Sequence, residues 1–450
     1  MPDTMDLTIT ILTGAVLAFS MWRAYRKYHD PLHPLMFLGP ICIYVYVYQP
    51  LMLQRVEISY YFPEKGSLEM AQTVILAFMA ALCYGLLNIK AAPDQIRGVT
   101  GKSFQPGVRS KQRFRIAALI LGSIGLGGFI YMSATGPGVL KAYGQYKGAL
   151  VAVSGYIGES TLLTIPACIL YIFSRQGEKW NLRHYALLAL FALPHLIHAF
   201  LGARRGPAFS IMVALLIPWF MTMSRRPSLR AVLTALLLIG IVIIFLFSQR
   251  SQIYIGSEFE FDKERFVEKL KPTEDAVNQG NDYIYGCGLM IASKFHNHHF
   301  WGRRYAVLML VRPIPRQIWP KKYSDTGMSF LVEEGSTAGM TDSQWMDAVG
   351  WFAYRGSAPG IVGDLFLEFG WFGLVGAYLL GLGFAWLWKN ALIRKGLWGV
   401  LYSLAGLLSI YLPAQSVTAF LYRFVFMSIP CILVWRYLIQ STELVQIPRE

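Results

Sequence analysis

A series of apolar runs, each long enough to cross a lipid bilayer as a helix, constrains this chain more than any other feature. Charged residues make up only 15% of the sequence, whereas soluble proteins carry about 25%. The first run lacks the basic region and the small-residue cleavage site of a leader, so we expect it to be a membrane helix. We therefore expect an all-α polytopic membrane protein with about eleven transmembrane helices, at residues 5–22, 35–53, 68–89, 115–134, 157–174, 184–202, 207–223, 231–248, 361–387, 397–413 and 420–439.

Lysine and arginine concentrate in alternate connecting segments, which all lie on one side of the expected bundle. Because basic loops stay in the cytoplasm, this side is expected to be cytoplasmic, with the N-terminus outside and the C-terminus inside. The net charge of +15 then largely reflects membrane orientation, so nucleic acid is not expected as a partner. The basic segments are 23–27, 90–115, 175–183, 225–230 and 389–395.

The connecting segment 249–358 is far longer than the others, and we expect it to form a large external loop. The chain is thus divided into a membrane region at 1–248 with about eight helices, this loop, and a membrane region at 359–450 with about three helices and a short cytoplasmic tail. An amphipathic stretch at 261–270 can rest on the membrane surface. The apolar run Tyr305–Val311 is too short to span and predicts a surface or re-entrant element.

The pair Arg204–Arg205 lies in a short turn, Gly-Ala-Arg-Arg-Gly-Pro at 202–207, between two apolar runs. The expected topology places this turn on the outer side, which normally avoids basic residues. An arginine near the membrane midplane costs about 2.5–3.5 kcal/mol on insertion scales, so such residues usually mark a function. Since guanidinium groups suit bidentate contact with phosphate, a cluster of them can hold a diphosphate without a metal ion. We therefore expect Arg204 and Arg205 to bind an anion.

Further basic residues of the outer side could join this site. Arg250 stands at the start of the external loop, and Arg423 lies near the beginning of the last expected helix. For the residues within the loop, a solvated or lipid-facing basic surface is the alternative interpretation. Those residues are Arg303, Arg304, Arg312, Arg316, Lys321, Lys322 and Arg355.

Asp364 and Glu368 are four residues apart at the outer end of the ninth expected helix, which places both carboxylates on one helix face. A carboxylate buried there could have a raised pKa and act as a general base toward a hydroxyl group. The alternative is a structural ion pair with one of the outer arginines. Both interpretations can hold, each for a different member of the pair.

Other kinds of chemistry find little support. His296, His298 and His299 are nearly adjacent, and histidines at this spacing seldom converge on one metal ion, so no metal site is expected. His195 and His198 precede the arginine pair, and they either line the same cavity or are hydrogen-bonded core residues. The cysteines offer no disulfide framework. No nucleotide-binding motif is present, so we expect no cofactor, and an anionic substrate must come from the membrane or the outer space.

These residues, in this order, resemble a known family, the bacterial oligosaccharide repeat-unit polymerases (O-antigen polymerases). Members have an arginine-rich turn between two central helices. The segment 313–322, Pro-Ile-Pro-Arg-Gln-Ile-Trp-Pro-Lys-Lys, is similar to the one that ends their large external loop. The segment 357–373, Ser-Ala-Pro-Gly-Ile-Val-Gly-Asp-Leu-Phe-Leu-Glu-Phe-Gly-Trp-Phe-Gly, resembles their segment with a carboxylate before Phe-Gly and a second glycine. Many members carry proline after the lysine, whereas Tyr323 follows Lys322 here, which leaves the role of Lys322 open.

The resemblance implies a membrane-embedded glycosyltransferase with a GT-C-like architecture in the cytoplasmic (inner) membrane of a bacterium. It would transfer a glycan from undecaprenyl diphosphate to the terminal sugar of another lipid-linked unit at the outer face. Its partners would be membrane lipids, the lipid-linked oligosaccharide, and a chain-length regulator or polysaccharide export proteins. Asp364 or Glu368 would act on the acceptor hydroxyl. The diphosphate would be bound, and its charge stabilised during catalysis, by Arg204, Arg205, Arg250, Arg312, Arg316 and Lys321.

Three other functions are compatible with these features. An O-antigen-ligase-like enzyme would move the glycan to a different acceptor and would need the same donor site. A flippase or transporter for lipid-linked oligosaccharide would extend a cationic cavity toward the cytoplasmic half, where the central stretches of the seventh and eighth helices carry no charge. A non-catalytic organiser of polysaccharide export would not need the arginine pair or the carboxylates for chemistry in vitro.

Overall fold

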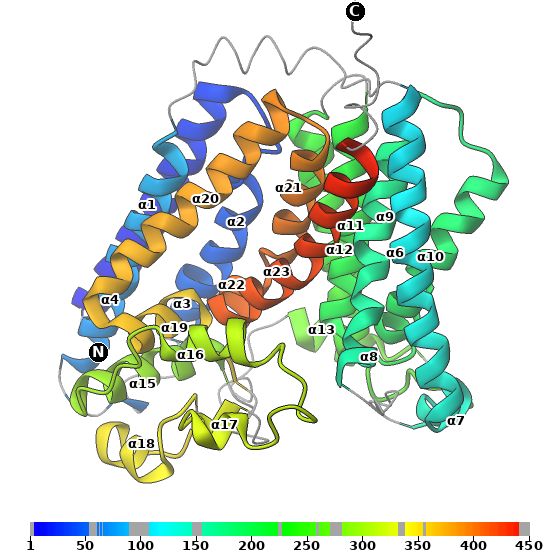
Figure 1. Cartoon of the computed structure of the whole chain (residues 1–450). Helices are drawn as coiled ribbons and strands as arrows, with labels where there is room; N and C mark the ends of the chain where they lie inside the picture. The colour runs from blue at the N-terminus through cyan, green and yellow to red at the C-terminus, as the bar shows by residue number, and fades with distance from the viewer. Residues whose placement is uncertain are drawn as a thin grey trace, which may run out of the picture. The chain divides into compact units, whose positions relative to one another are not determined.

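The computed structural model of the chain is built of helices (Figure 1). It describes residues 4–53, 61–62, 64, 66–89, 108–145, 155–223, 227–257, 261–270, 281–331, 338–353 and 357–440, and every regular element in these ranges is a helix. Nine helical segments there are long and apolar enough to cross a membrane, which confirms the all-α polytopic membrane class. They are Leu7–Tyr28, Leu35–Leu53, Ser67–Leu87, Ser110–Thr135, Tyr156–Ser174, Leu229–Leu246, Gly360–Ile393, Leu397–Ala414 and Val417–Tyr437.

The sixth and seventh predicted spans are helices that fall outside these nine. They correspond to α10 (Leu182–Phe200) and α11 (Arg205–Thr222). The apolar part of α11, Gly206–Thr222, is shorter than any of the nine segments. The predicted count of eleven spans is therefore not confirmed, although helices occupy all eleven predicted positions.

The chain forms two compact units that cut across the order of the sequence. Unit 1 comprises Met1–Lys90, Pro272–Trp386 and Leu408–Arg423, and unit 2 comprises Ala91–Lys271, Leu387–Leu407 and Phe424–Glu450. The segment 249–358, predicted as one external loop, is shared between the units. Its first part belongs to unit 2, and the rest belongs to unit 1.

Unit 1 combines long apolar helices with several short ones. Its elements are α1 (Thr4–Tyr28), α2 (Leu35–Ile43), η1 (Tyr44–Tyr48), α3 (Gln49–Leu53), α4 (Ser67–Leu87), α15 (Asp282–Phe295), α16 (Arg303–Ala306), η5 (Val307–Val311), α17 (Lys322–Asp325), η6 (Ser329–Leu331), α18 (Asp342–Val349), α19 (Gly360–Phe369), η7 (Gly370–Phe372) and α22 (Tyr411–Ala414), with the first parts of α20 (Gly373–Ile393) and α23 (Val417–Val434). The run Tyr305–Val311, predicted as a surface or re-entrant element, forms η5 and the end of α16, and its Leu310 is 72% exposed.

Glycines allow α4 and α20 to pack closely together within unit 1. A Cβ atom on Gly85 would overlap the α20 backbone at Tyr378, and one on Gly381 would overlap the carbonyl group of Leu82 in α4. The amide of Asn88 also donates a hydrogen bond to the Tyr378 hydroxyl at 2.8 Å. Small residues let membrane helices approach closely where lipid provides no hydrophobic drive for their association.

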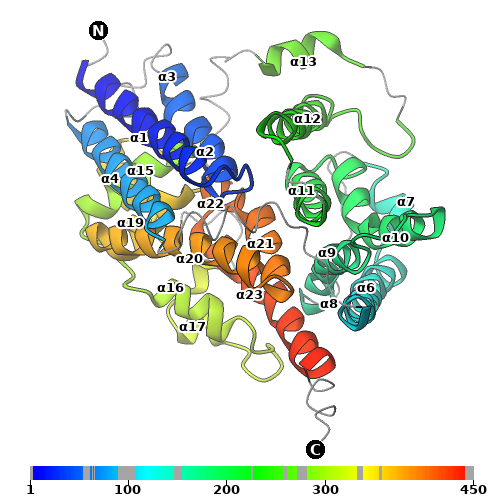
Figure 2. The same cartoon turned by 90° about the horizontal axis from the view of Figure 1, so that it is seen from above.

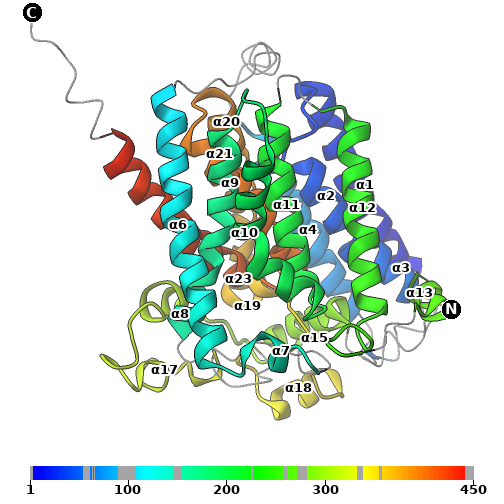
Figure 3. The ribbon, with the colours of Figure 1, turned by 90° about the vertical axis from the view of Figure 1, so that its right-hand side faces the viewer.

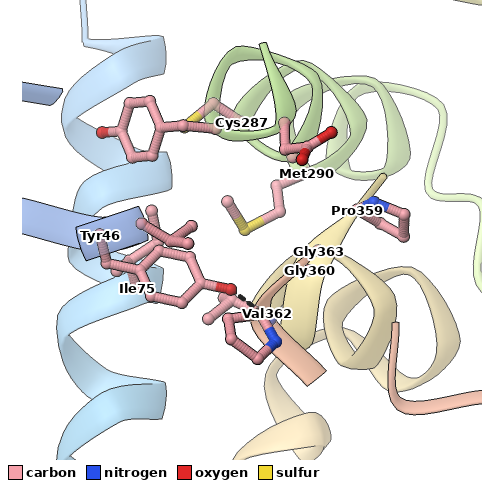
Figure 4. A pocket seen from close by; sticks show the side chains of 13 residues that line it. Tyr46, Ile75, Cys287, Met290, Pro359, Gly360, Val362 and Gly363 are labelled. Carbon is pink, nitrogen blue, oxygen red and sulfur yellow. Dashed lines mark hydrogen bonds between the residues drawn. The ribbon is translucent and has the colours of Figure 1, made fainter. Parts of the chain in front are cut away.

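Two short helices, α15 and α19, form the interior of unit 1, and almost all of their residues are buried. They cross where Gly286 faces Gly363. A small cavity lies beside this crossing, and Tyr46 from η1 forms part of its wall (Figure 4). The Tyr46 hydroxyl accepts a hydrogen bond from the Ile361 backbone N–H at 3.0 Å, so it satisfies a group at the start of α19 that has no partner within the helix.

The predicted ninth span, 361–387, is divided into two helices in the structure. Gly370 ends α19 with φ of 55° and ψ of −137°, a backbone conformation that glycine adopts readily. The ten residues of α19 rise about 15 Å, half the thickness of the bilayer core. The carboxylates of Asp364 and Glu368 therefore belong to a short buried helix, and α20, with 21 residues, is the part that can span.

Unit 2 contains a bundle in which α6, α9, α10 and α11 lie side by side (Figures 2 and 3). The start of α10 is closed by a capping box, in which the Asn181 side chain accepts from the His184 N–H at 3.2 Å. The amphipathic stretch predicted at 261–270 forms α13, which follows α12. The elements of unit 2 are α6 (Val108–Thr135), α7 (Gly138–Ala142), α8 (Gly155–Ser160), η4 (Thr161–Leu163), α9 (Thr164–Ser174), α10, α11, α12 (Leu229–Ser248), α13 (Lys263–Leu270), α21 (Leu397–Leu408) and η8 (Trp435–Gln440), with the last parts of α20 and α23.

One end of unit 2 gathers basic residues that the sequence assigned to the cytoplasmic side. Arg175 pairs with Glu178 at 2.5 Å, and Arg115 lies 3.7 Å from the same carboxylate. The last residue of α11, Thr222, accepts a hydrogen bond from Gln176 at this end. Because α10 begins here and α11 ends here, the turn that joins them lies at the opposite end of the unit.

Candidate functional site

The first candidate site is the turn between α10 and α11 in unit 2. Its backbone is tightly folded, with the Arg204 N–H donating to the carbonyl oxygen of Ala199 at 3.0 Å. Ala203 has φ of 44°, in the left-handed region that residues with side chains rarely adopt. A Cβ atom on Gly202 would lie 2.6 Å from the carbonyl oxygen of His198, so this position requires glycine. These contacts give the turn one defined shape.

The turn exposes Arg204. This residue is the N-cap of α11, and Arg205 is the first helical residue. The first N–H groups of a helix lack partners within it and carry partial positive charge, so this position favours an anion. Among the residues that the structure describes, no carboxylate forms an ion pair with Arg204. The side chain of Arg205 lies outside the described part, so its role stays a prediction.

Arg250 lies at the same end of unit 2 as this turn. Leu246, near the end of α12, packs with Ala199 from α10 and Ala208 from α11, and Ile253 packs against this cluster. Arg250 follows α12 by two residues and is half-buried. Three helix ends therefore bring two of the predicted anion-binding residues, Arg204 and Arg250, to one end of the unit.

Two histidines of α10 precede the turn. The Nδ1 atom of His198 lies 2.5 Å from the Tyr143 hydroxyl, and Nδ1 of His195 lies 3.1 Å from the Thr164 hydroxyl. The carbonyl oxygen of Tyr143 also accepts from the N–H of Ile255 at 2.8 Å, which ties the segment after α12 to the same place. Both histidines are thus hydrogen-bonded within the bundle, as one of the two sequence interpretations predicted.

The second candidate site is an ion-pair network in unit 1, where α16, α19 and the start of α23 meet. Arg304 contacts both predicted carboxylates, because its Nη2 pairs with Asp364 Oδ1 and its Nε donates to Glu368 Oε2 at 2.8 Å. The Arg304 backbone N–H donates to Glu368 Oε1 at 3.2 Å. The Tyr305 hydroxyl and the Thr418 N–H donate to Asp364 Oδ2 at 3.0 and 3.1 Å. All four carboxylate oxygens therefore accept a hydrogen bond.

The local backbone explains why Arg304 faces α19. The N–H of Trp301 donates to the carbonyl oxygen of Glu368 at 2.7 Å, and the N–H of Phe300 donates to that of Leu367 at 3.3 Å. Gly302 follows with φ of 86°, a conformation that turns the chain into α16. The segment before α16 is thus fastened to the end of α19, which leaves Arg304 beside both carboxylates.

The network is withdrawn from solvent. Asp364 and Glu368 are 0% exposed and Arg304 is 4% exposed. Burial by itself lowers the pKa of the Arg304 guanidinium, but the adjacent carboxylates raise it above its ordinary value, so the group stays charged. Burial and then Asp364 raise the pKa of the Tyr305 hydroxyl, which therefore stays protonated and can donate.

The structure thus shows the ion-pair alternative for Asp364 and Glu368. The predicted catalytic role of these two residues is left as a prediction. Sequence reasoning placed Arg304 only among the basic loop residues. Two carboxylates on an apolar helix need a buried cation as their partner. This need was the sequence signal that could have pointed to Arg304.

Three more predicted phosphate ligands, Arg312, Arg316 and Lys321, also belong to unit 1. The Arg312 guanidinium is half-buried and lies 3.9 Å from the centre of the Tyr422 ring. Arg316 and Lys321 are exposed. The predicted set is thus divided, because Arg204 and Arg250 belong to unit 2 while these three residues and both carboxylates belong to unit 1.

Lys322, whose role the sequence left open, has a structural role. It is buried, and its ammonium group donates to three carbonyl oxygens at the end of η5 and just after it. These are the oxygens of Val311, Arg312 and Ile314, at 3.2, 2.7 and 2.5 Å. Lys322 therefore stabilises the turn of the backbone that contains Arg312.

The histidines at 296–299 are held by other contacts. The Nε2 atom of His296 lies 2.9 Å from the carbonyl oxygen of Gln344, and Nδ1 of His299 lies 3.1 Å from the Ser293 hydroxyl. His298 packs edge-on against Phe300. In the described ranges no group of three potential metal-ligating side chains comes together.

Comparison with protein-family models, with curated proteins and with solved structures finds no match for this chain. The function must therefore be inferred from the geometry of the two sites and from the sequence motifs.

Proposed function

We propose that the protein is a membrane-embedded glycosyltransferase that polymerises lipid-linked oligosaccharide repeat units. It transfers a glycan from undecaprenyl diphosphate to the terminal sugar of another lipid-linked unit, at the outer face of the bacterial cytoplasmic membrane. The observation that carries this proposal is Arg204, an exposed arginine at the start of α11 that forms no ion pair with any carboxylate in the described part of the chain. It stands at the end of unit 2 opposite Arg115 and Arg175, which belong to segments that the positive-inside rule assigns to the cytoplasm.

The chemistry requires a cationic site that binds the leaving group. The acceptor hydroxyl attacks the anomeric carbon, the bond from this carbon to the diphosphate breaks, and the hydroxyl proton is released. Negative charge grows on the departing diphosphate, so guanidinium groups fixed beside it stabilise the transition state more than the ground state. Arg204, Arg205 and Arg250 supply this charge in the proposal, without a metal ion.

Asp364 and Glu368 receive a positioning role in this proposal. Their oxygens accept hydrogen bonds from Arg304, Tyr305 and Thr418, which hold α16, α19 and α23 together. A base that acts on the acceptor must reach the proton that it removes. Asp364 and Glu368 are 0% exposed, and both are paired with Arg304. This arrangement suits a structural role in unit 1 better than proton transfer.

An in vitro extension assay tests the proposal. The purified full chain is given undecaprenyl-diphosphate-linked repeat units from its host, and the products are separated on a gel. We expect a ladder of extended glycans, and about a 100-fold to 1,000-fold lower rate for Arg204→Ala, as for the loss of other preorganised charge-stabilising groups. The ladder should persist in EDTA, because arginines replace a metal in this site.

The matched control is Arg183→Ala, which removes an exposed arginine at the other end of α10 and should leave the ladder unchanged. Arg204→Lys should extend far more slowly than the wild type, because lysine lacks the planar fork. Absence of any ladder with folded protein and authentic substrate would reject the polymerase and favour transfer to a different acceptor. Normal extension by Arg204→Ala would reject the donor site.

A further inference from the structure

Three basic side chains converge on one carboxylate at the end of unit 2 that lies opposite the Arg204 turn. Nη1 of Arg175, in the segment after α9, lies 2.5 Å from Oε2 of Glu178. On α6, Nη2 of Arg115 lies 3.7 Å from the same oxygen, and Nζ of Lys111 lies 3.7 Å from Oε1. One carboxylate therefore joins the start of α6 to the end of α9 through three cations.

This cluster carries more positive than negative charge. Within the described ranges Glu178 is the carboxylate that contacts these cations, so three positive charges face one negative charge and two are in excess. Arg175 is the C-cap of α9, but a helix C-terminus carries only about half a negative charge and offsets part of the excess. The side chains of Lys111 and Arg115 are 21% and 43% exposed, so an anion can reach them from the surface.

Arg175 is the buried member of the cluster, with 8% exposure. Its Nη2 donates to the carbonyl oxygen of Lys179 at 3.2 Å, which fixes the guanidinium within the turn between α9 and α10. Its Nε is buried and has no hydrogen-bond partner in the described part of the chain. A buried donor without a partner costs about 1–3 kcal/mol. A fixed guanidinium with an unused N–H group is therefore ready to donate to a further acceptor.

Aromatic and apolar side chains follow the cluster along the chain. The Trp180 ring, two residues after Glu178, lies 5.1 Å from the ring of Tyr185 and 5.3 Å from that of Trp219, between centres. Tyr185 is 50% exposed, and Leu182 is 84% exposed. The two cations of α6 lie at the beginning of a candidate membrane span. Because tryptophan and tyrosine gather at the level of lipid headgroups, these features place the cluster at the surface of the bilayer.

We propose that Lys111, Arg115 and Arg175 bind the phosphate group of an anionic phospholipid. Ammonium and guanidinium groups donate short, charge-assisted hydrogen bonds to phosphate oxygens. Basic pockets between membrane helices on the cytoplasmic side bind anionic headgroups, and the positive-inside rule assigns this end of unit 2 to the cytoplasm. The exposed apolar side chains beside the cluster suit the acyl chains of a lipid, which a free phosphate ion lacks. This site is separate from the Arg204 turn and does not depend on the proposed glycan transfer.

Glu178 has an opposing effect in this site. It holds the three cations together, but its negative charge also repels a phosphate group that approaches them. Removal of a cation should therefore weaken lipid binding, whereas removal of the Glu178 charge should strengthen it. A cluster that only joins α6 to α9 would not produce these opposite responses, so their signs separate a binding site from a structural ion pair.

The test is native mass spectrometry on the detergent-purified full chain, titrated with phosphatidylglycerol and, separately, with the zwitterionic phosphatidylcholine. We expect one phosphatidylglycerol to bind about tenfold or more tightly than phosphatidylcholine. Lys111→Gln and Arg115→Gln should each weaken it about tenfold, as expected for the loss of a charge-assisted hydrogen bond. Glu178→Gln should strengthen it by up to about fivefold, the scale of a half-exposed ion pair.

The matched control is Arg183→Gln, which removes an exposed arginine at the same end of the unit that contacts no carboxylate in the described part of the chain. It should bind phosphatidylglycerol like the wild type. Equal affinities for the two lipids would overturn the proposal, and so would unchanged binding by both Lys111→Gln and Arg115→Gln. These two variants alter partly exposed side chains, so they decide the question even if Arg175→Gln does not fold.

A last titration separates the two sources of phosphate. Inorganic phosphate is added to the same chain without lipid, and we expect it to bind at least tenfold more weakly than phosphatidylglycerol, because it lacks the acyl chains. Equal affinity for inorganic phosphate would assign the site to a free ion and overturn the lipid assignment. Weaker lipid binding by Glu178→Gln would show that the carboxylate supports the cluster without competing, and would also reject the site as proposed. None of these outcomes bears on glycan extension.

Discussion

The turn at Arg204 and the network at Arg304 use the same side chain in opposite ways. Arg304 is 4% exposed and contacts two carboxylates, so its charge is neutralised inside the protein. Arg204 is exposed at a helix start and has no ion pair among the described residues. In a membrane protein, a neutralised arginine holds helices together, whereas an arginine without a counter-charge is available to a ligand. Whether its guanidinium group has a carboxylate partner therefore distinguishes a structural arginine from a ligand-binding one better than its position in an apolar sequence does.

The largest expected effect is the loss of stability in Arg304→Ala. This change leaves two buried carboxylates without a counter-charge, which typically costs about 3–5 kcal/mol. We expect a much lower yield of folded protein and a lower unfolding temperature in detergent, measured by thermal unfolding. Arg204→Ala should change the free energy of unfolding by less than about 0.5 kcal/mol, as usual for exposed residues.

Arg303→Ala is the matched control for Arg304→Ala, because it removes the adjacent arginine, which is exposed. It should unfold at nearly the wild-type temperature. Neutralising the carboxylates as well, in Arg304→Leu with Asp364→Asn and Glu368→Gln, should recover part of the stability, since uncharged groups avoid the penalty of an unpaired charge. If Arg304→Ala unfolded at the same temperature as Arg303→Ala, the buried ion pairs of Arg304 would not stabilise the fold.

An intermediate effect is expected for Gly202→Ala in the turn. The new Cβ would lie 2.6 Å from the carbonyl oxygen of His198, so the backbone that carries Arg204 must shift. Overpacking of this kind costs about 1–3 kcal/mol. We expect a modestly lower unfolding temperature together with slower glycan extension, because displaced charge stabilises a transition state poorly.

Gly127→Ala is the control in the same unit, because a Cβ atom built there meets no atom within 4 Å apart from the neighbouring backbone of its own helix. Alanine favours a helix over glycine, so this variant should be as stable as the wild type or more stable. Equal extension rates for Gly202→Ala and Gly127→Ala would show that the shape of the turn does not matter for activity.

The smallest expected effect is the response to salt. Exposed charges are screened over about 8 Å at physiological ionic strength and over about 3 Å at 1 M, whereas buried pairs are screened much less. Raising the salt concentration should therefore weaken the binding of inorganic diphosphate at the exposed Arg204 site. The difference in unfolding temperature between wild type and Arg304→Ala should stay constant. A salt-dependent difference would indicate that water reaches the Arg304 network.

The helical fold could be predicted because hydropathy is a local property. Each predicted apolar run is helical, although some runs contain more than one helix, and the ends shift by up to several residues, as for the run at 115–134 and α6 (Val108–Thr135). The division of the ninth run was not visible, because apolar residues continue through Phe369 and Trp371 on both sides of the bend. Hydropathy records the side chains but not the backbone angle at Gly370.

The candidate sites were predictable only in part, and for a related reason. The Arg204 turn is local, so six consecutive residues sufficed to single it out. The partner of Asp364 and Glu368 lies 60 and 64 residues away in Arg304, and only the tertiary fold selects it from the other loop arginines. The division of the predicted ligands between two units likewise depends on long-range packing, which spacing in the sequence does not encode.

The hydrogen bond from Thr418 to Asp364 has a consequence for biogenesis. A ribosome delivers Arg304 first, Asp364 and Glu368 next, and Thr418 only after another 50 residues. The acidic pair can therefore meet Arg304 and Tyr305 while synthesis continues, but the second hydrogen bond to Asp364 Oδ2 forms only after the start of α23 has been made. The start of α23 thus completes the polar centre of unit 1, and a nascent chain stopped before Thr418 would lack this contact.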